Sequence, residues 1–209
     1  TYDVKNITEE GVEALPASEI TAVLVGTDAK HMLEIAKLNK LTTVPVFNLS
    51  SDADSLRQVC LPNLLNIPLS KQMKQDALAQ WQNKNPDKLV TAHAWHHDFV
   101  KFAASQLNNR FTRNHKTQMT DDAWAGWAAI KMLSDTVART QKTDSAAMLN
   151  YLKKDLSFDG QKGDTATFRD TGQLRQIVLL IDKDDNIVAE APLRGVKGGL
   201  DSLGLISCK

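Results

Sequence analysis

The sequence lacks any excess of charge of one sign. Lys and Arg total 25 and Asp and Glu total 25, so the formal net charge is +0 at pH 7. Nucleic acids and anionic membrane surfaces select for basic faces, which this balance does not favour. The chain also lacks the run of about 18 or more apolar residues that a membrane-spanning helix needs. We therefore expect neither nucleic-acid binding nor insertion into a membrane.

Signatures of catalysis are missing as well. The sequence contains no P-loop, no G-x-G-x-x-G and no G-x-S-x-G motif, and Ser50 has no plausible His–Asp relay. Without a nucleophile, a phosphate-binding loop or a dinucleotide fingerprint, we expect a binding protein that is not an enzyme.

Cysteine is scarce, with only Cys60 and Cys208, and no C-x-x-C pair is present. Two cysteines are too few for a zinc site without help from histidines. They are either two unrelated buried thiols or one disulfide that ties the C-terminal tail to the loop after Leu56. Such a bond would stabilise the fold by about 4–5 kcal/mol in the chain-entropy model and would imply an oxidising compartment. The chain begins at Thr1 without Met, and we expect that a signal peptide has been removed.

The composition is otherwise that of a globular protein. The 209 residues are 42% hydrophobic and 24% charged, which fits a single α/β domain over 1–209. Strands and helices alternate in 1–92, helices dominate 93–156, and 157–209 is rich in strands and ends in a tail. Predicted strands cover 20–25, 44–47, 64–67, 89–92, 165–169, 174–181 and 187–191. Predicted helices cover 29–39, 56–59, 70–83, 98–111, 120–133 and 145–155.

This order of elements predicts the fold class. Alternation of strands and helices favours a mostly parallel sheet with right-handed crossovers and helices on both faces. The turn Asp184-Asp185-Asn186 between two strands predicts a β-hairpin near the C-terminus. The acidic turn resembles the start of a calcium loop but lacks its later glycine and glutamate, so we interpret it as a solvated hairpin turn.

Polar residues follow the first two predicted strands, where ligands gather in open α/β sheets. Thr27, Ser50 and Ser51 offer hydroxyl groups to a ligand. Carboxylates in the same loops would repel an anionic group and favour a hard cation such as calcium or a trivalent lanthanide. These carboxylates are Asp28, Asp52 and Asp54. The alternative is that Asp28 and Asp52 only cap helices, as aspartate commonly does.

The segment H-x-x-H-H is a second candidate site. His93, His96 and His97 could ligate copper or zinc, although no Glu follows His93 as in the H-E-x-x-H signature. The alternative is a set of neutral imidazoles packed beside Trp95. The four tryptophans could likewise line a pocket for a flat ligand, or belong to the core as their helical spacing favours. They are Trp81, Trp95, Trp124 and Trp127.

Several sequence blocks also carry a resemblance to a known family. They are PVFNLSSDADSLRQVCLPNLL (45–65), SKQMKQDALAQW (70–81), AWHHDF with SQLNNRF (94–111), MTDDAWAGWAAIK (119–131), GQLRQIVLL (172–180) and LDSLG before Cys208. Their order, over about 20–208, resembles type I periplasmic solute-binding proteins, the branched-chain amino-acid receptors of ABC transporters. The likeness is strongest to the substrate-binding proteins that accompany PQQ-dependent alcohol dehydrogenase systems.

The resemblance implies a periplasmic protein that binds a small solute or a metal ion such as a lanthanide. Its expected partners are the membrane components of an ABC transporter or proteins of the alcohol dehydrogenase system. Because the subgroup carries cysteines at both positions, the resemblance also favours a disulfide between Cys60 and Cys208.

The chain departs from the family in one place. A short turn, NKNPDK over 83–88, stands where the family places most of its second lobe. We therefore expect a shortened, single-lobe version. One alternative is a non-catalytic adaptor that has lost the ligand cleft and forms a homodimer through an exposed apolar face. Another is a histidine-based copper or zinc carrier.

Overall fold

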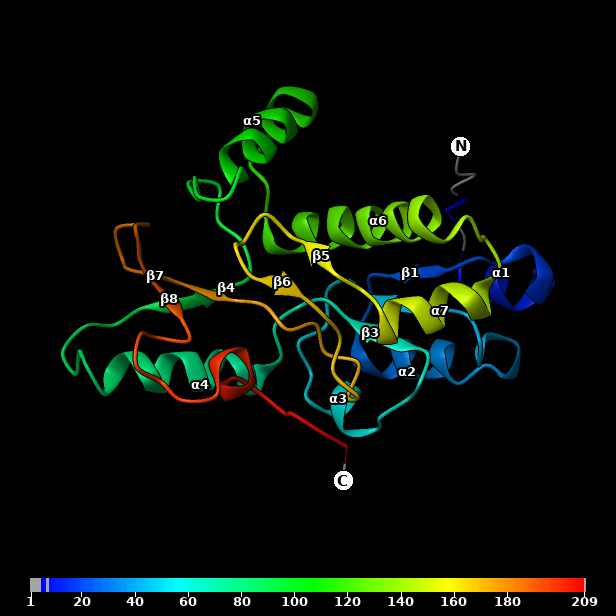
Figure 1. The fold of residues 1–209 in the computed structure, drawn as a ribbon, viewed down its shortest axis with the longest axis horizontal. Helices are drawn as coiled ribbons and strands as arrows, with labels where there is room; N and C mark the ends of the chain where they lie inside the picture. The colour runs from blue at the N-terminus through cyan, green and yellow to red at the C-terminus, as the bar shows by residue number, and fades with distance from the viewer. Residues whose placement is uncertain (1–4, 7, 209) are drawn as a thin grey trace.

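The structure is a computed structural model that describes residues 5, 6 and 8–208 (Figure 1). Its first half contains α1 (Glu9–Ala14), β1 (Val23–Val25), α2 (Ala29–Ala36), β2 (Val46–Asn48), α3 (Ser55–Gln58), β3 (Leu64–Asn66), α4 (Lys71–Gln82) and β4 (Thr91–His93). Its second half contains α5 (Ala104–His115), α6 (Asp121–Thr140), α7 (Ser145–Lys154), β5 (Phe158–Asp159), β6 (Thr165–Ala166), β7 (Val178–Ile181) and β8 (Ile187–Ala191). Short 3-10 helices occupy Ala17–Glu19, Asn39–Leu41 and Gly199–Ser202.

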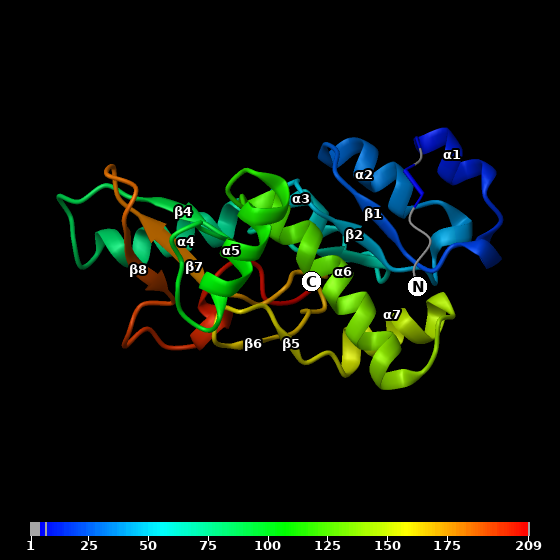
Figure 2. The same cartoon turned by 90° about the horizontal axis from the view of Figure 1, so that it is seen from above.

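Three parallel strands form the first sheet, in the order β1-β2-β3. Side chains alternate between its faces, because successive residues of a strand point to opposite sides. Val46 and Leu64 pack in a core cluster with α2, whereas Phe47 and Leu65 pack in a larger cluster with α6 and α7. Figure 2 shows α2 on one side of the sheet and α6 and α7 on the other. The predicted parallel sheet with helices on both faces is confirmed.

A second, antiparallel sheet has the order β4-β7-β8, and β7 and β8 form the predicted hairpin. The strand predicted at 89–92 was expected to continue the parallel sheet, and that expectation is wrong. β4 instead pairs with β7, with Thr91 opposite Ile181. All four residues of β7 are buried, so its backbone needs a partner on both edges, which β4 and β8 supply. This sheet lies at the opposite end of the molecule from α1 and α2 (Figure 1).

Residues 172–174 join the two sheets. The Asn66 N–H donates to the Gly172 carbonyl at 2.7 Å, and the Leu174 N–H donates to the Asn66 carbonyl at 2.9 Å. Gly172 has φ 73°, and a Cβ at this position would lie 2.1 Å from the Leu64 carbonyl oxygen, so only glycine fits. The chain thus adds to the edge of β3 before it enters β7.

All but one of the predicted helices begin within one residue of their predicted starts. The side chains of Asp28, Ser70 and Thr120 accept backbone N–H bonds at the starts of α2, α4 and α6. The helix predicted from Asp98 begins only at Ala104. The Asp98 N–H donates to His96 Nδ1, and Ala103 has φ 66°, so the chain between them is not helical.

The C-terminal tail is held in two ways. Cys60 and Cys208 form a disulfide with their Cα atoms 6.0 Å apart, as the family resemblance implied. The buried guanidinium of Arg169 donates to the Leu200 and Leu203 carbonyls at 2.6 and 2.8 Å, and to Asp201 at 3.0 Å. The disulfide thus fastens the tail to the segment that follows α3, and Figure 1 shows the red tail passing below α3.

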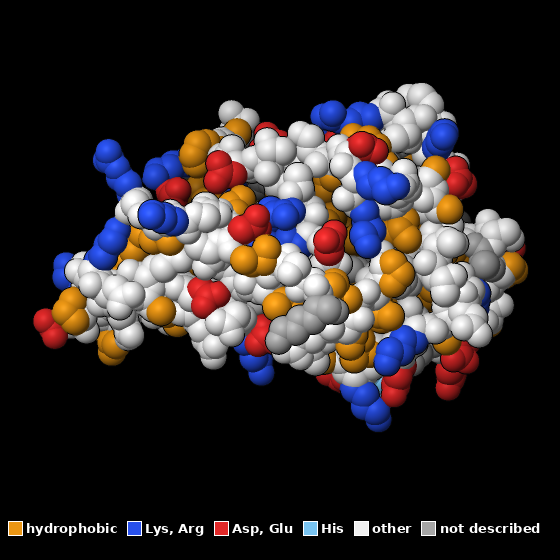
Figure 3. All heavy atoms as spheres, turned by 60° about the horizontal axis from the view of Figure 1, so that its bottom comes forward, with side chains coloured by type: hydrophobic (Ala, Val, Ile, Leu, Met, Phe, Trp, Pro, Cys, Tyr) orange, Lys and Arg blue, Asp and Glu red, His pale blue; other side chains and the backbone are white. Residues whose placement is uncertain are grey.

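Surface charge is mixed. On the face drawn in Figure 3, basic and acidic side chains are interspersed with apolar ones. None of the helices in the part of the chain that the structure describes has the length and apolarity needed to cross a bilayer.

Candidate functional site

The loops that follow β1 and β2 lie side by side, as the parallel pairing of these strands requires. The Ser50 hydroxyl donates to the Thr27 carbonyl at 3.3 Å and so links the two loops directly. The structure therefore brings both groups of predicted ligand-binding residues to one edge of the sheet.

The second of these loops is shaped by the buried side chain of Asn48. Its Oδ1 accepts the N–H groups of Ser50 and Ser51 at 3.2 and 2.9 Å, and its Nδ2 donates to the Ser51 carbonyl at 2.7 Å. The buried guanidinium of Arg57 also donates to the Ser51 carbonyl at 3.0 Å. The amide groups that a ligand carboxylate would use are thus already bonded within the protein.

The three carboxylates of the two loops have protein partners of their own. Asp28 caps α2 and lies 2.6 Å from His31 Nδ1, and the bond with His31 holds the pKa of this carboxyl below its usual value. Asp52 pairs with Lys74 at 3.0 Å, and Asp54 accepts an N–H from the first turn of α4. The capping interpretation therefore holds for Asp28 and is wrong for Asp52, because α3 and α4 begin at other cap residues and the Asp52 side chain pairs with Lys74. Cation binding by the three together stays a prediction.

A cavity of about 850 Å³ runs along β1 and reaches the first of these loops. Apolar side chains of β1, α6 and α7 form one wall, among them Leu24, Leu133 and Met148. Thr27 and His31 lie at its border on the side of the strand end. Among the described strands, β1 is the outermost of its sheet, and its residues line the cavity. Pockets of about 300–1,000 Å³ with apolar walls and a few polar groups are typical of small-molecule sites.

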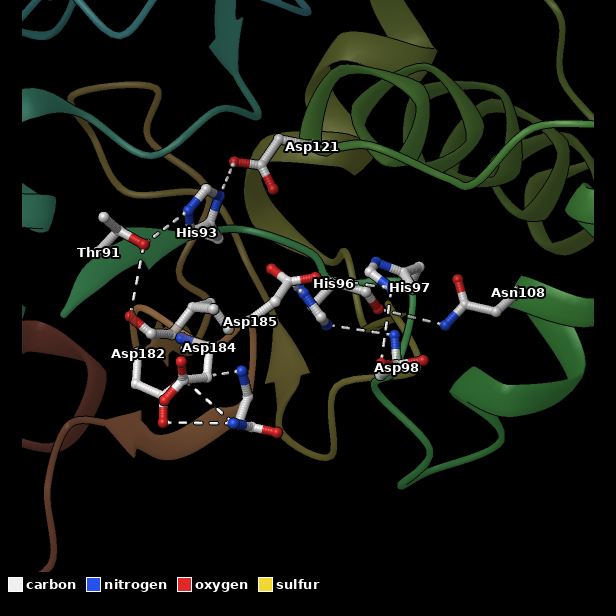
Figure 4. Close-up of polar contacts among 12 residues, drawn as sticks. Thr91, His93, His96, His97, Asp98, Asn108, Asp121, Asp182, Asp184 and Asp185 are labelled. Atoms are coloured by element: carbon white, nitrogen blue, oxygen red, sulfur yellow. Dashed lines mark hydrogen bonds and ion pairs between the residues drawn. The ribbon is translucent and has the colours of Figure 1, made fainter.

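His93 is separated from the other histidines of the H-x-x-H-H segment (Figure 4). It lies 3.6 Å from Asp121, and this contact raises the pKa of the imidazole. Burial pushes the pKa of Asp121 upward, but bonds from His93 and from the Trp95 and Ala94 N–H groups outweigh it, so the pKa is lowered. The pair joins the end of β4 to the start of α6, which is a structural role.

His96 and His97 instead meet two carboxylates (Figure 4). His96 Nε2 lies 3.2 Å from Asp185 Oδ1, and His97 Nε2 lies 3.8 Å from Asp185 Oδ2. His97 Nε2 is also 3.5 Å from Asp98 Oδ2. One ligand atom from each of His96, His97 and Asp98 lies within 4.8 Å of the others, and no other such group occurs among the described residues.

Three of the four tryptophans are buried in the core, where Trp81 lies together with Trp95 and Trp124. Trp95 and Trp124 are buried and stack with ring centroids 5.8 Å apart. Trp95 Nε1 donates to Asn108 Oδ1 at 2.8 Å, and Trp124 Nε1 donates to the Gly160 carbonyl at 3.2 Å. Both indoles are therefore satisfied within the protein.

Reasoning from the sequence missed three residues of this region. The sequence placed Asp98 and Asp121 only in the first turns of predicted helices, and Asp185 only in a solvated turn. The adjacency of Asp98 to His97 was a usable signal. The approach of Asp185 was not, because it depends on the pairing of β4 with a hairpin about ninety residues later in the chain.

Comparison with known proteins gives the fold. No protein-family model and no curated protein sequence matches the chain. A periplasmic binding protein from Burkholderia mallei superposes with a TM-score of 0.70 at 11% identity, over 82% of this chain and 76% of that one. The isoleucine complex of the branched-chain amino acid substrate-binding protein LivJ from Streptococcus pneumoniae gives a TM-score of 0.66 at 8% identity, over 86% of this chain and 81% of that one. A benzoate complex of an ABC-transporter solute-binding protein from R. palustris gives a TM-score of 0.65 at 11% identity, over 92% of this chain and 84% of that one.

These likenesses show that the chain has the α/β fold of a lobe of type I periplasmic binding proteins. At such low identities these likenesses define the fold only. The identity of a ligand has to be argued from the residues of this chain.

Proposed function

We propose that this protein is a non-catalytic solute-binding component of an ABC transport system in the periplasm. The observation that carries the proposal is the fold, which this chain shares with solute-binding proteins of ABC transporters. The disulfide between Cys60 and Cys208 supports an oxidising compartment outside the cytoplasm.

The cavity along β1 is the proposed binding site. Its apolar wall suits the hydrophobic body of a small solute, and Thr27 and His31 suit a polar head group. The proposed solutes are therefore small molecules with an apolar body and a polar head group, of which amino acids and aromatic carboxylates are the first to test. The LivJ and R. palustris proteins were solved with isoleucine and benzoate, both of which fit that description.

A thermal-shift screen tests this function. The panel contains isoleucine, leucine, benzoate, PQQ, calcium and a lanthanide. A ligand at 100 times its dissociation constant stabilises the fold by about 2.7 kcal/mol, which raises the melting temperature of a chain of this size by about 5–10 °C. We expect this rise with an apolar carboxylate. A flat response to every carboxylate would contradict the proposal.

A glycine pair supplies matched variants for the site. Gly26 lines the cavity, Gly126 lies on α6 away from it, and a Cβ added to either meets no atom within 4 Å. Gly26→Leu should fill part of the cavity and reduce the affinity for the carboxylate at least tenfold, as measured by isothermal titration calorimetry. Gly126→Leu should bind it like the original protein. Equal affinities for the two variants would place the ligand elsewhere.

The link to PQQ-dependent alcohol oxidation is a finer proposal that rests on the sequence resemblance. Stabilisation by PQQ or by a lanthanide in the same screen would support it. Asp28, Asp52 and Asp54 would be the residues to test by conversion to asparagine, because their carboxylates lie in the loops after β1 and β2 and supply hard oxygen ligands.

An adaptor role is the second candidate, and exposed apolar side chains favour it. Leu89, Val100 and Phe102 expose 79%, 68% and 52% of their surface. A homodimer of about twice the 23.1 kDa mass of the chain, measured by light scattering without solute, would support that role. A monomer would support the receptor.

A further inference from the structure

We propose that His96, His97, Asp98 and Asp185 form a binding site for one divalent transition metal ion, with zinc as the type. The site lies between the segment after β4 and the β7–β8 turn (Figure 4). It is separate from the cavity along β1, whose lining includes none of these residues. The proposal therefore does not depend on the proposed solute function.

The spacing of the donor atoms carries the proposal. Nitrogen and oxygen ligands lie about 2.0–2.1 Å from zinc, so two ligands of a tetrahedral site are about 3.3 Å apart. The four side chains place imidazole nitrogen and carboxylate oxygen atoms 3.2, 3.5 and 3.8 Å from each other. One ligand atom from each of His96, His97 and Asp98 lies within 4.8 Å of the others, and Asp185 approaches both imidazoles, so rotations of these side chains would bring the donors to the tetrahedral spacing.

The donor types select the class of metal. Imidazole nitrogen suits zinc, copper and nickel, whereas calcium takes six to eight oxygen ligands at longer distances. Two imidazoles with two carboxylates therefore favour a transition metal over calcium or a lanthanide. This ligand set differs from the H-x-x-H-H motif, because His93 is paired with Asp121 instead.

Rigid segments hold the ligands in place. His96 is 7% exposed, and its carbonyl accepts N–H bonds from Phe99 at 3.0 Å and from Asn108 Nδ2 at 3.2 Å. Within the hairpin turn, Asp182 Oδ1 accepts the N–H groups of residues 184 and 186, both at 2.9 Å. Asp185 has φ 64° in this turn, which directs its carboxylate to the histidines. These bonds preorganise the backbone that carries the ligands, which lowers the cost of binding.

Proton positions indicate which histidine binds first. His96 Nδ1 accepts the Asp98 N–H at 3.2 Å, so the proton of a neutral ring lies on Nε2 and is donated to Asp185. Ligation through His96 Nε2 requires that proton to move to Nδ1 and the bond to Asp98 N–H to open. His97 Nε2 faces both carboxylates. The geometry thus makes His97 the primary nitrogen ligand.

The site is open to an entering ion. The side chains of Asp98 and Asp185 are 73% and 69% exposed, whereas that of His96 is 8% exposed. Both carboxylates also line a surface cavity of about 580 Å³ beside the hairpin. An ion can therefore enter through the carboxylates and reach the imidazoles beneath them.

Cobalt(II) titration of the full chain tests the proposal, because tetrahedral Co²⁺ absorbs visible light strongly. We expect one Co²⁺ per chain with the tetrahedral spectrum, displaced by Zn²⁺. His97→Gln should reduce the affinity for Co²⁺ at least a hundredfold. Asp185→Asn, an exposed and isosteric change, should reduce this affinity at least tenfold.

His93→Gln and His115→Gln serve as controls and should bind Co²⁺ like the original protein. Retention of no Co²⁺ after dialysis would overturn the proposal, as would unchanged affinity in both His97→Gln and Asp185→Asn. An equal loss of Co²⁺ affinity in His93→Gln and His97→Gln would also overturn the proposal, because the ligands would then be the histidines of the H-x-x-H-H motif.

Discussion

The double variant Cys60→Ser/Cys208→Ser is expected to lose about 5 kcal/mol of unfolding free energy. The two cysteines are 148 residues apart in sequence, and the disulfide removes the closure entropy of that loop from the unfolded chain. For a protein of this size the loss lowers the melting temperature by about 10–20 °C. Urea unfolding of the variant, followed by tryptophan fluorescence, measures the change.

The tail should stay docked in this variant. Arg169 still binds the Leu200 and Leu203 carbonyls, and Asp76 still accepts the Gly204 N–H at 2.6 Å. We therefore expect an unchanged near-ultraviolet circular dichroism spectrum together with the lower stability. Addition of a thiol reductant should destabilise the original protein and leave the variant unaffected. Stabilities within 1 kcal/mol of each other would contradict the loop-entropy account.

The parallel sheet could be predicted because its signals are local. The strand Val23–Val25 is a β-branched apolar run that ends at Gly26, and a capping aspartate follows at Asp28. Apolar residues at helical spacing then gave α2 and α4 close to their observed bounds. They also gave the start of α6, which continues to Thr140, beyond its predicted end at residue 133. Each of these elements buries residues that its own sequence pattern identifies.

The second sheet depends on contacts that are remote in sequence. β4 is only three residues long, and its pairing with β7 is decided by which strand edge is left open in the folded protein. The late start of α5 has a similar origin, because Phe102 and Ala103 adopt positive φ values that their residue types do not favour. Tertiary packing around Trp95 holds the segment before α5. A pattern in the local sequence does not reveal this packing.

In the candidate sites, too, features that depend on local sequence could be predicted and those that depend on remote contacts could not. Parallel pairing placed Thr27 and Ser50 together as the sequence predicted. The use of the loop amides by Asn48 could not be predicted, because an asparagine in a strand has no fixed partner. In the histidine segment, the motif identified His96 and His97, but only the tertiary fold adds Asp185.

Lys162 is expected to make the stability of the protein depend on pH above neutrality. Its ammonium is buried, donates to the Ala94 carbonyl at 2.6 Å and to Gln176 Oε1 at 2.8 Å, and lies 4.7 Å from the centre of the Trp124 ring. Burial lowers the pKa of this group from 10.5 to about 7. Between these values the unfolded chain holds one more proton than the folded protein. The unfolding free energy should therefore rise with pH, by about 1.4 kcal/mol per unit.

Lys162→Met should remove this slope, because methionine fills a similar volume and carries no titrating group. The stability difference between the original protein and the variant should change by about 4 kcal/mol from pH 7 to pH 10, in favour of the original protein at high pH. The exposed substitution Lys142→Met is the matched control and should keep the original slope. Urea unfolding at half-unit pH intervals measures all three proteins. Parallel curves for the original protein and Lys162→Met would show that the ammonium keeps an ordinary pKa in the folded state.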